Sequence, residues 1–173
     1  MVDINALRQV KAFARQDGAF MALLWIASFL FSVLMPESSL GSLLALATPF
    51  FIGFRLKQFR NYALDGIISF RRGYAYVVYS FIYASLIFAI VQFLYFRYLD
   101  NGSFAATIAN TAQVLTPMYE QGGLNKQDID ASLSMMMAMK PIHWAFVFMM
   151  QNIFIGFLLA LPVALAYRRS DQQ

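Results

Sequence analysis

Several basic residues and tyrosines follow one another at a spacing that could bind phosphate. They are Arg55, Lys57, Arg60, Arg71, Arg72, Tyr76, Tyr79 and Tyr83. Guanidinium groups pair well with phosphate oxygens, and basic residues beside a membrane attract anionic headgroups. The tyrosines recur at helical spacing after Arg71 and Arg72, where they could lie along a lipid chain. The set therefore predicts a site that binds a lipid phosphate or docks a partner protein, while aromatic packing and interface anchoring explain the tyrosines equally well.

Three neutral amides interrupt otherwise apolar stretches. Gln92 lies in the stretch 74–97, and Gln151 and Asn152 lie near the middle of 142–167. An unpaired amide in hydrocarbon costs several kcal/mol, so these side chains must face protein or a wet cavity. Hydrogen bonds between helices, worth about 1 kcal/mol each, are one explanation. A polar pocket within the membrane, lined by all three amides, is the other.

Metal and enzyme chemistry find little support in the residues. Methionines cluster in residues 135–150 around the single histidine, His143, and thioethers are soft ligands for Cu(I). Consecutive methionines on a helix point in different directions, however, and methionine is a common filler of apolar surfaces. The chain has no cysteine, which excludes thiolate catalysis and thiolate metal sites. No phosphate-binding glycine loop, nucleophile elbow or zinc helix is present. We expect a non-enzymatic protein without a cofactor or metal.

Four apolar stretches must position these residues, at about 18–35, 40–57, 74–97 and 142–167. The chain is 60% hydrophobic and only 13% charged, whereas a soluble domain carries about 25% charged residues. The pattern predicts an all-α integral membrane four-helix bundle that forms a single membrane domain over residues 1–173. Pro49 predicts a kink in the second helix. Pro141 suits the first turn of the fourth.

The basic residues lie mostly on one side of these stretches. Of the 13 lysines and arginines, all but Arg97, Lys126 and Lys140 share the side that holds both termini. By the positive-inside rule this side is cytoplasmic, which predicts cytoplasmic N- and C-termini. The first apolar run is longer than a signal-peptide core and no cleavage site follows it, so we expect it to be retained. Without a cysteine scaffold or an organelle presequence, a bacterial inner (cytoplasmic) membrane is the expected location.

Two cytoplasmic segments have amphipathic spacing, residues 1–17 and residues 58–73, and both predict short helices at the membrane interface. With 1–17 placed outside the membrane, no Asp, Glu, Lys, Arg or His falls in the central part of any predicted span. Ionisable residues deep in a membrane are typical of proton relays and ion pathways. Their absence argues against a proton-coupled pump and against a channel with a charged filter.

The segment of about 103–140 is the one sizeable piece outside the predicted spans. Its apolar residues follow two helical patterns, the first ended by Pro117 and Gly122-Gly123 and the second begun at Asn125, a good N-cap. We expect an extracytoplasmic amphipathic helical hairpin between the third and fourth spans. Each helix is too short to be stable alone, so packing or the membrane interface must hold it.

The run YALDGIISFRRG at residues 62–73 and the exit from the third span, YFRYLD at 95–100, resemble domain of unknown function 4199. The resemblance covers nearly the whole chain. It implies a small four-helix inner-membrane protein of a kind common in Bacteroidetes, without an established activity. Gene neighbourhoods of this family contain a polyprenyl-phosphate glycosyltransferase, so the resemblance also suggests a peripheral glycosyltransferase or another membrane protein as a partner.

Two functions follow from the sequence. The first is a non-enzymatic accessory or scaffold protein that contacts anionic headgroups at the cytoplasmic face, does not bind nucleic acid, and docks a peripheral enzyme of polyprenyl-phosphate lipid metabolism through residues 55–73. The alternative is a small protein that translocates or binds a lipid or solute in a polar intramembrane pocket. A polar cavity open to one side would favour the alternative, and a solidly packed bundle would favour the scaffold.

Overall fold

The computed structural model describes residues 4–123 and 125–169, and this part of the chain is helical with no strand. The helices are α1 (Ile4–Leu34), α2 (Leu40–Leu46), α3 (Thr48–Ala63), α4 (Phe70–Tyr98), α5 (Ser103–Gln121), α6 (Lys126–Met137) and α7 (Pro141–Tyr167). Four segments are long and apolar enough to cross a membrane: α1, α2 with α3, α4, and α7. The prediction of an all-α fold is therefore confirmed, with four helical segments that are candidates to span a membrane.

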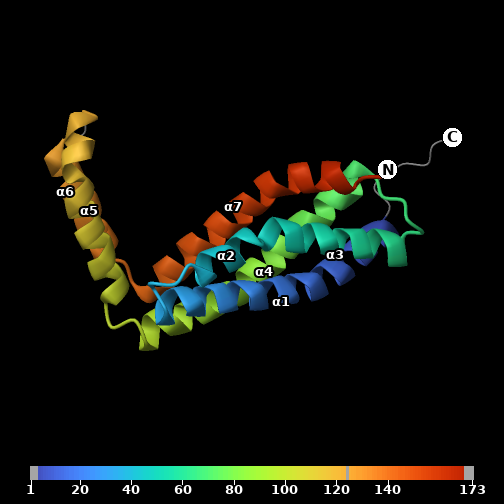
Figure 1. Cartoon of the computed structure of the whole chain (residues 1–173), viewed down its shortest axis with the longest axis horizontal. Coiled ribbons are helices and arrows are strands. Elements are labelled where there is room, and N and C mark those ends of the chain that lie inside the picture. Colours follow the sequence, from blue (N-terminus) through green and yellow to red (C-terminus); the bar gives the residue numbers. More distant parts are fainter. Residues whose placement is uncertain (1–3, 124, 170–173) are drawn as a thin grey trace. The chain divides into compact units, whose positions relative to one another are not determined.

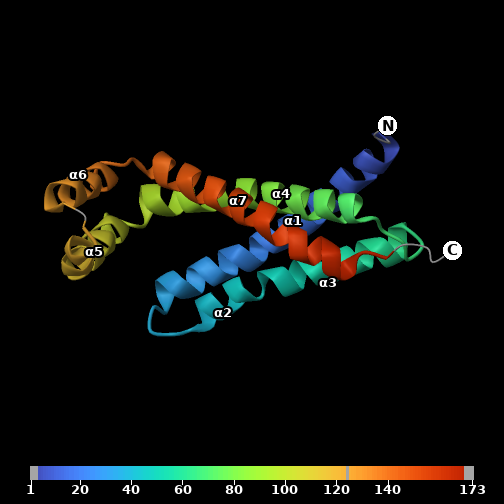
Figure 2. The same ribbon diagram turned by 90° about the horizontal axis from the view of Figure 1, so that it is seen from above.

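The chain divides into two compact units, and each is described by itself. The first, called the bundle unit, comprises the described residues up to Ala89 and those from Phe148 onward; the second unit is Ile90–Val147. Figures 1 and 2 show α1, α3, α7 and the first part of α4 running alongside one another in the bundle unit. Its core combines aliphatic and aromatic side chains, and the Trp25 ring packs edge to face with Phe81 and Phe88 at centroid distances of 5.5 and 5.9 Å.

Helix α1 is longer than expected, because a separate interfacial helix was predicted over residues 1–17. Residues 4–17 do not form a separate interfacial helix, because α1 continues without a break into the first span. The buried residues Val10, Ala14, Met21 and Trp25 follow one another at intervals of four or seven positions, so one apolar face runs through both segments. At Gly18 a Cβ would lie 2.7 Å from the Ser80 carbonyl oxygen, so α1 and α4 touch backbone to backbone there.

The second span is broken at Ala47 into α2 and α3, where Pro49 lies in the first turn of α3. Proline is tolerated at this position, since its missing N–H would have had no partner within the helix. The Trp25 indole N–H donates to the Thr48 hydroxyl over 3.0 Å and ties the break to α1. The predicted kink at Pro49 is therefore present as a helix junction.

The link between α3 and α4 is not the amphipathic helix that its spacing predicts. Helix α3 runs on to Ala63, past the expected end at 57, and α4 begins at Phe70. Asp65 and Gly66 between them have φ values of 51° and 83°. These left-handed conformations are incompatible with a continuous helix, and they reverse the chain within six residues.

This end of the bundle unit, called the basic end, consists of α1 up to Arg15, residues 57–72 and residues 167–169. Gln9 Nε2 donates to the Ala63 carbonyl over 3.1 Å. Arg60 Nη1 donates to the Tyr167 carbonyl over 2.9 Å. Ile68 and Arg169 exchange two backbone hydrogen bonds of 3.0 and 3.1 Å. The first turns of the described chain and its last residues therefore lie at the same end of the bundle unit.

In the second unit, α5 follows α4 after a short turn. The Phe104 amide donates to Asp100 Oδ1 over 2.9 Å, and the Phe104 ring packs edge-on against Trp144 at 5.0 Å. Helix α5 continues to Gln121 through Pro117, which was expected to end it. The proline costs one backbone bond close to the helix end, where the carbonyl that loses its donor belongs to the exposed Gln113.

Helix α6 begins as the sequence predicts. The Asn125 side chain accepts a hydrogen bond from the Gln127 amide over 3.2 Å and caps the helix. The helix ends at Met137, and Pro141 opens α7 after three residues. The prediction of a cap at Asn125 and of Pro141 in the first turn of the last span is confirmed.

Candidate functional site

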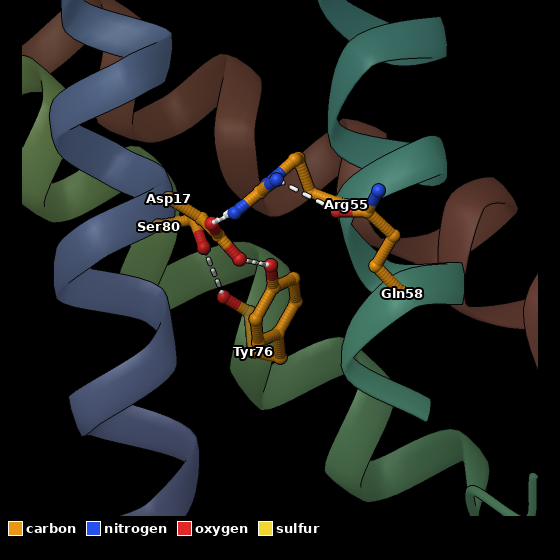
Figure 3. A network of polar contacts seen from close by, with 5 residues as sticks. All are labelled: Asp17, Arg55, Gln58, Tyr76 and Ser80. Atoms are coloured by element: carbon orange, nitrogen blue, oxygen red, sulfur yellow. Dashed lines mark hydrogen bonds and ion pairs between the residues drawn. The ribbon is translucent and has the colours of Figure 1, made fainter. Parts of the chain in front are cut away.

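A buried carboxylate joins three helices of the bundle unit. Asp17 of α1 is 2% exposed. One of its oxygens, Oδ1, accepts two hydrogen bonds from the guanidinium of Arg55 on α3, of which the bond from Nε measures 2.7 Å. The other, Oδ2, accepts a hydrogen bond from the hydroxyl of Tyr76 on α4 (Figure 3). Both carboxylate oxygens therefore have partners: the ion pair connects α1 to α3, and the tyrosine hydrogen bond connects α1 to α4.

Neighbouring residues hold each member of this cluster in place. Gln58, one turn after Arg55, accepts from Arg55 Nη1 over 2.7 Å. The Tyr76 ring stacks on Phe59 with centroids 4.9 Å apart and planes 8° from parallel. Ser80 donates to the Tyr76 carbonyl over 2.8 Å (Figure 3). Asp17 is also next to Gly18, the residue that lets α1 approach α4.

This cluster bears on the expectation that the predicted spans carry no ionisable residue in their central part. The helix that forms the first candidate span, Ile4–Leu34, begins earlier than predicted and buries Asp17, and Arg55 points into the bundle. The guanidinium also lies over the Phe20 ring, with Cζ 5.3 Å from the centroid. The signal was present in the sequence, because Asp17 continues the buried spacing of Val10 and Ala14. It was missed because the first span was taken to begin at Gly18.

The polar groups of this cluster hold the helices together and leave no free group for a ligand at Asp17 or at the guanidinium of Arg55. Charges removed from water are costly unless they are paired and hydrogen-bonded, and both conditions are met here. The three guanidinium nitrogens of Arg55 all donate, and both oxygens of Asp17 accept. An arrangement with these groups already engaged fixes the relative positions of α1, α3 and α4 at the level of the ion pair.

The eight residues predicted as a phosphate or docking site separate into two groups. Arg55 and Tyr76 lie inside the bundle unit, in the cluster around Asp17. Arg60, Arg72, Tyr79 and Tyr83 are half-buried, and Lys57 and Arg71 are exposed. Arg72 donates to the Gln9 side chain, and its guanidinium lies over the Phe59 ring. The surface part of the predicted site is therefore carried by Lys57 and Arg71, with Arg60 and Arg72 tying the basic end together.

Other basic residues extend this surface beyond the predicted set. The exposed cations of the basic end, called the basic surface, are Arg8, Lys11, Arg15, Lys57, Arg71, Arg168 and Arg169. Lys11 also places its ammonium 5.1 Å from the centroid of the Tyr79 ring. Among the described residues of this end, Asp65 is the exposed acid. The surface is strongly cationic, because its seven cations outnumber the one exposed acid among the described residues of this end. The buried Asp17 does not offset them, since it is paired with Arg55.

The three amides predicted to line an intramembrane pocket have different environments. Gln92, in the second unit, is 4% exposed, and its Oε1 has no hydrogen-bond partner among the described residues. Gln151 and Asn152, in the bundle unit, are exposed and half-buried respectively. Ser85 also buries a hydroxyl without a partner in the described part of the chain. A pocket shared by the three amides stays a prediction.

Comparison with known proteins identifies a family and no more. The family model described as "Protein of unknown function (DUF4199)" matches residues 16–169. No curated protein and no solved structure matches the chain. Within the described residues, no group of three or more His, Cys, Asp or Glu could hold a metal ion.

Proposed function

The chain belongs to the DUF4199 family of proteins of unknown function, and from this premise we propose that it is a non-enzymatic scaffold of a bacterial inner membrane. Its basic surface faces the cytoplasm and docks a peripheral enzyme that acts on polyprenyl-phosphate lipids. The observation that carries this proposal is the gathering of seven exposed cations at one end of the bundle unit: Arg8, Lys11, Arg15, Lys57, Arg71, Arg168 and Arg169.

The orientation is supported by the distribution of charge. Lysine and arginine next to membrane spans accumulate on the cytoplasmic side, and the basic end carries most of those of the chain. With four spans and this end inside, both termini are cytoplasmic and the α5–α6 segment is extracytoplasmic. The basic surface then meets anionic headgroups and the proteins that work beside them.

The hydrogen bonds within the basic end support a role in docking a partner protein. The backbone of the basic end is tied by the Gln9–Ala63, Arg60–Tyr167 and Ile68–Arg169 hydrogen bonds. The Asp17–Arg55 pair fixes the helices just beneath it. A surface whose geometry is set in advance loses less conformational entropy when a partner binds. The cations therefore form a preorganised site for an acidic protein face and for the phosphates of its lipid substrate.

A photo-crosslinking residue introduced at Lys57 or Arg71 tests the proposal in native membranes. We expect cross-links to a polyprenyl-phosphate glycosyltransferase, identified by mass spectrometry. The yield should fall with rising salt, because exposed charges are screened within about 8–10 Å at physiological ionic strength. The reversal Lys57→Glu/Arg71→Glu should abolish the cross-link formed from a probe at Arg168.

The matched control is Lys126→Glu/Lys140→Glu, which changes charge equally in the second unit and leaves the basic surface intact. Cross-linking from Arg168 should be unchanged in this variant. Capture of lipids alone, or a protein cross-link that survives reversal at Lys57 and Arg71, would remove the docking role.

A second function is favoured by Gln92. Its buried Oε1 lacks a partner among the described residues, and such an acceptor can bind a polar group of a lipid or solute within the membrane. Translocation or binding of that ligand is the alternative to the scaffold. A photo-crosslinking residue at Gln92 separates the two, because capture of a small molecule rather than a lipid tail favours the alternative.

A further inference from the structure

The strongest unassigned feature of the second unit is a groove between α5 and α6 with a volume of about 460 Å³. Its floor is apolar and consists of Ile108, Ala112, Leu115, Ile129, Leu133 and Met136. Neither helix buries a residue in the described structure. The volume falls in the range of about 300–1,000 Å³ that is usual for small-molecule sites. The groove has the size and lining of a site for an apolar ligand.

Two threonine hydroxyls along the groove already have hydrogen-bond partners within α5. The Thr107 hydroxyl donates to the Ser103 carbonyl over 3.0 Å, and the Thr111 hydroxyl donates to the Thr107 carbonyl over 2.9 Å. Both donors are therefore already used within α5. A ligand that fills this part of the groove needs no hydrogen-bonding group of its own.

The length of the groove matches one lipid chain. Its lining runs along α5 from Thr107 to Tyr119, which at 1.5 Å per residue is about 18 Å. One leaflet of a bilayer contributes about 15 Å, half of the hydrocarbon thickness of about 30 Å. A single acyl chain of a membrane lipid therefore extends along most of the groove.

The ends of the groove differ. Thr107 and Met136 lie close in sequence to α4 and α7, which end and begin at Tyr98 and Pro141. At this end Phe104 packs on both Phe96 and Trp144, so the groove starts near the last turns of α4 and the first turns of α7. Tyr119 and Asp128 lie at the other end, next to the turn between α5 and α6. The groove is thus apolar at the first end and polar at the second.

Charge decides which headgroup fits the polar end. Asp128 is the acidic lining residue, and no lining residue is a lysine or arginine. A carboxylate attracts an ammonium, with which it forms a charge-assisted hydrogen bond, and repels an anionic headgroup. The Tyr119 hydroxyl adds a neutral partner for the same group. A lipid with an ammonium headgroup has the complementary charge.

We propose that the α5–α6 groove binds one acyl chain of a membrane lipid with an ammonium headgroup, with the ammonium at Asp128 and the chain end beside Thr107 and Met136. In this pose the tail lies at the end where α5 and α6 connect to α4 and α7, and the headgroup lies at the turn between α5 and α6. This site is separate from the basic surface, and its test does not depend on the docking function.

Photoactivatable lipids test the proposal on the full chain in vesicles. Phosphatidylethanolamine and phosphatidylglycerol with the same diazirine-bearing acyl chain are compared at equal mole fraction, and the labelled residues are mapped by mass spectrometry. We expect labelling of residues 108–115 and 129–136, several-fold stronger with phosphatidylethanolamine. Asp128→Asn should remove this preference. Asp130→Asn, a nearby exposed carboxylate outside the lining, should retain it.

A second pair of variants tests occupancy of the groove itself. Ala112→Trp places a large ring in the lining, whereas Val114→Trp places it on the same helix at a position that is 76% exposed and outside the lining. Labelling of residues 129–136 should be lost in the first variant and kept in the second, with unchanged helical circular dichroism in both. Equal labelling by the two lipids in the native chain would overturn the proposal. So would labelling that survives Ala112→Trp, or cross-links between two copies of the chain through the groove.

Discussion

At the scale of single residues, the cluster around Asp17 explains how a chain with few charged residues keeps one of them inside. Asp17 is matched by the guanidinium of Arg55 and by the hydroxyl of Tyr76, so the carboxylate has lost its water without losing its hydrogen bonds. Removing one partner of such a pair leaves an uncompensated charge, whereas replacing both with apolar residues can be nearly neutral. The contribution of the pair therefore depends on both members being present.

Single substitutions at this pair should destabilise the protein far more than substitution of both members together. Asp17→Ala or Arg55→Ala alone should lower the free energy of unfolding by about 3–5 kcal/mol, because each leaves a buried unpaired charge. The double variant Asp17→Leu/Arg55→Met should recover most of that loss. Unfolding in mild detergent, followed by circular dichroism, measures the differences.

Glu37→Ala serves as the control, since this carboxylate is exposed; it should change stability by less than about 0.5 kcal/mol. A double variant that is as unstable as the sum of the two single variants would show that the cluster does not act as a pair.

At the scale of helices, the bundle unit depends on glycines at its crossings. A Cβ at Gly156 of α7 would lie 2.5 Å from both Cβ and Cγ of Phe81 on α4, well inside contact distance. At Gly73, in the first turns of α4, the nearest atoms would be 3.6–3.8 Å away, on Ala164 and Leu56. The two glycines look alike in the sequence, and only the first is required by packing.

The same substitution should therefore have opposite effects at the two positions. Gly156→Ala forces α7 away from Phe81 and should cost about 1–3 kcal/mol of stability, as overpacking usually does. Gly73→Ala fits its surroundings and should gain up to about 1 kcal/mol from helix propensity. Thermal unfolding of the two variants under the same detergent conditions checks both signs. A stabilised Gly156→Ala variant would contradict the close crossing of α4 and α7.

Helix features that depend on neighbouring residues in the sequence could be predicted, whereas those that depend on packing could not. The apolar runs, the Asn125 cap and Pro141 at the start of α7 are local, so the sequence was sufficient for them. The extent of α1 and the link between α3 and α4 were missed for physical reasons. A polar helical turn and a membrane span can share one buried face, as Val10 and Met21 do. The left-handed residue Asp65 interrupts a spacing that otherwise looks helical.

The candidate site was less predictable than the fold. The cations of residues 55–73 were recognised, but their separation into an internal pair and an exposed surface depends on which helix faces which. Arg55 and Lys57 are two residues apart on α3, and only the first meets Asp17. Such a distinction follows from tertiary packing, which composition and spacing do not contain.

At the scale of the whole molecule, the hydrogen bonds of Gln9 and Arg169 place the first turns of α1 and the end of α7 at one end of the bundle unit. A chain with four spans returns to the side from which it started, and the proposed topology places this side in the cytoplasm on the basis of the positive-inside rule. The absence of native cysteine makes this assignment directly measurable, because an introduced thiol is the sole target for a maleimide.

Single-cysteine variants should fall into two classes in intact spheroplasts treated with a membrane-impermeant maleimide. Arg8→Cys, Arg71→Cys and Arg168→Cys should react after the membrane is permeabilised and not before, whereas Glu120→Cys and Lys126→Cys should react at once. All five side chains are exposed, so accessibility to the reagent depends on the compartment rather than on burial. Reaction of Arg8→Cys and Arg168→Cys in opposite compartments would exclude four spans. Reversal of the two classes would place the basic surface outside and exclude a cytoplasmic partner.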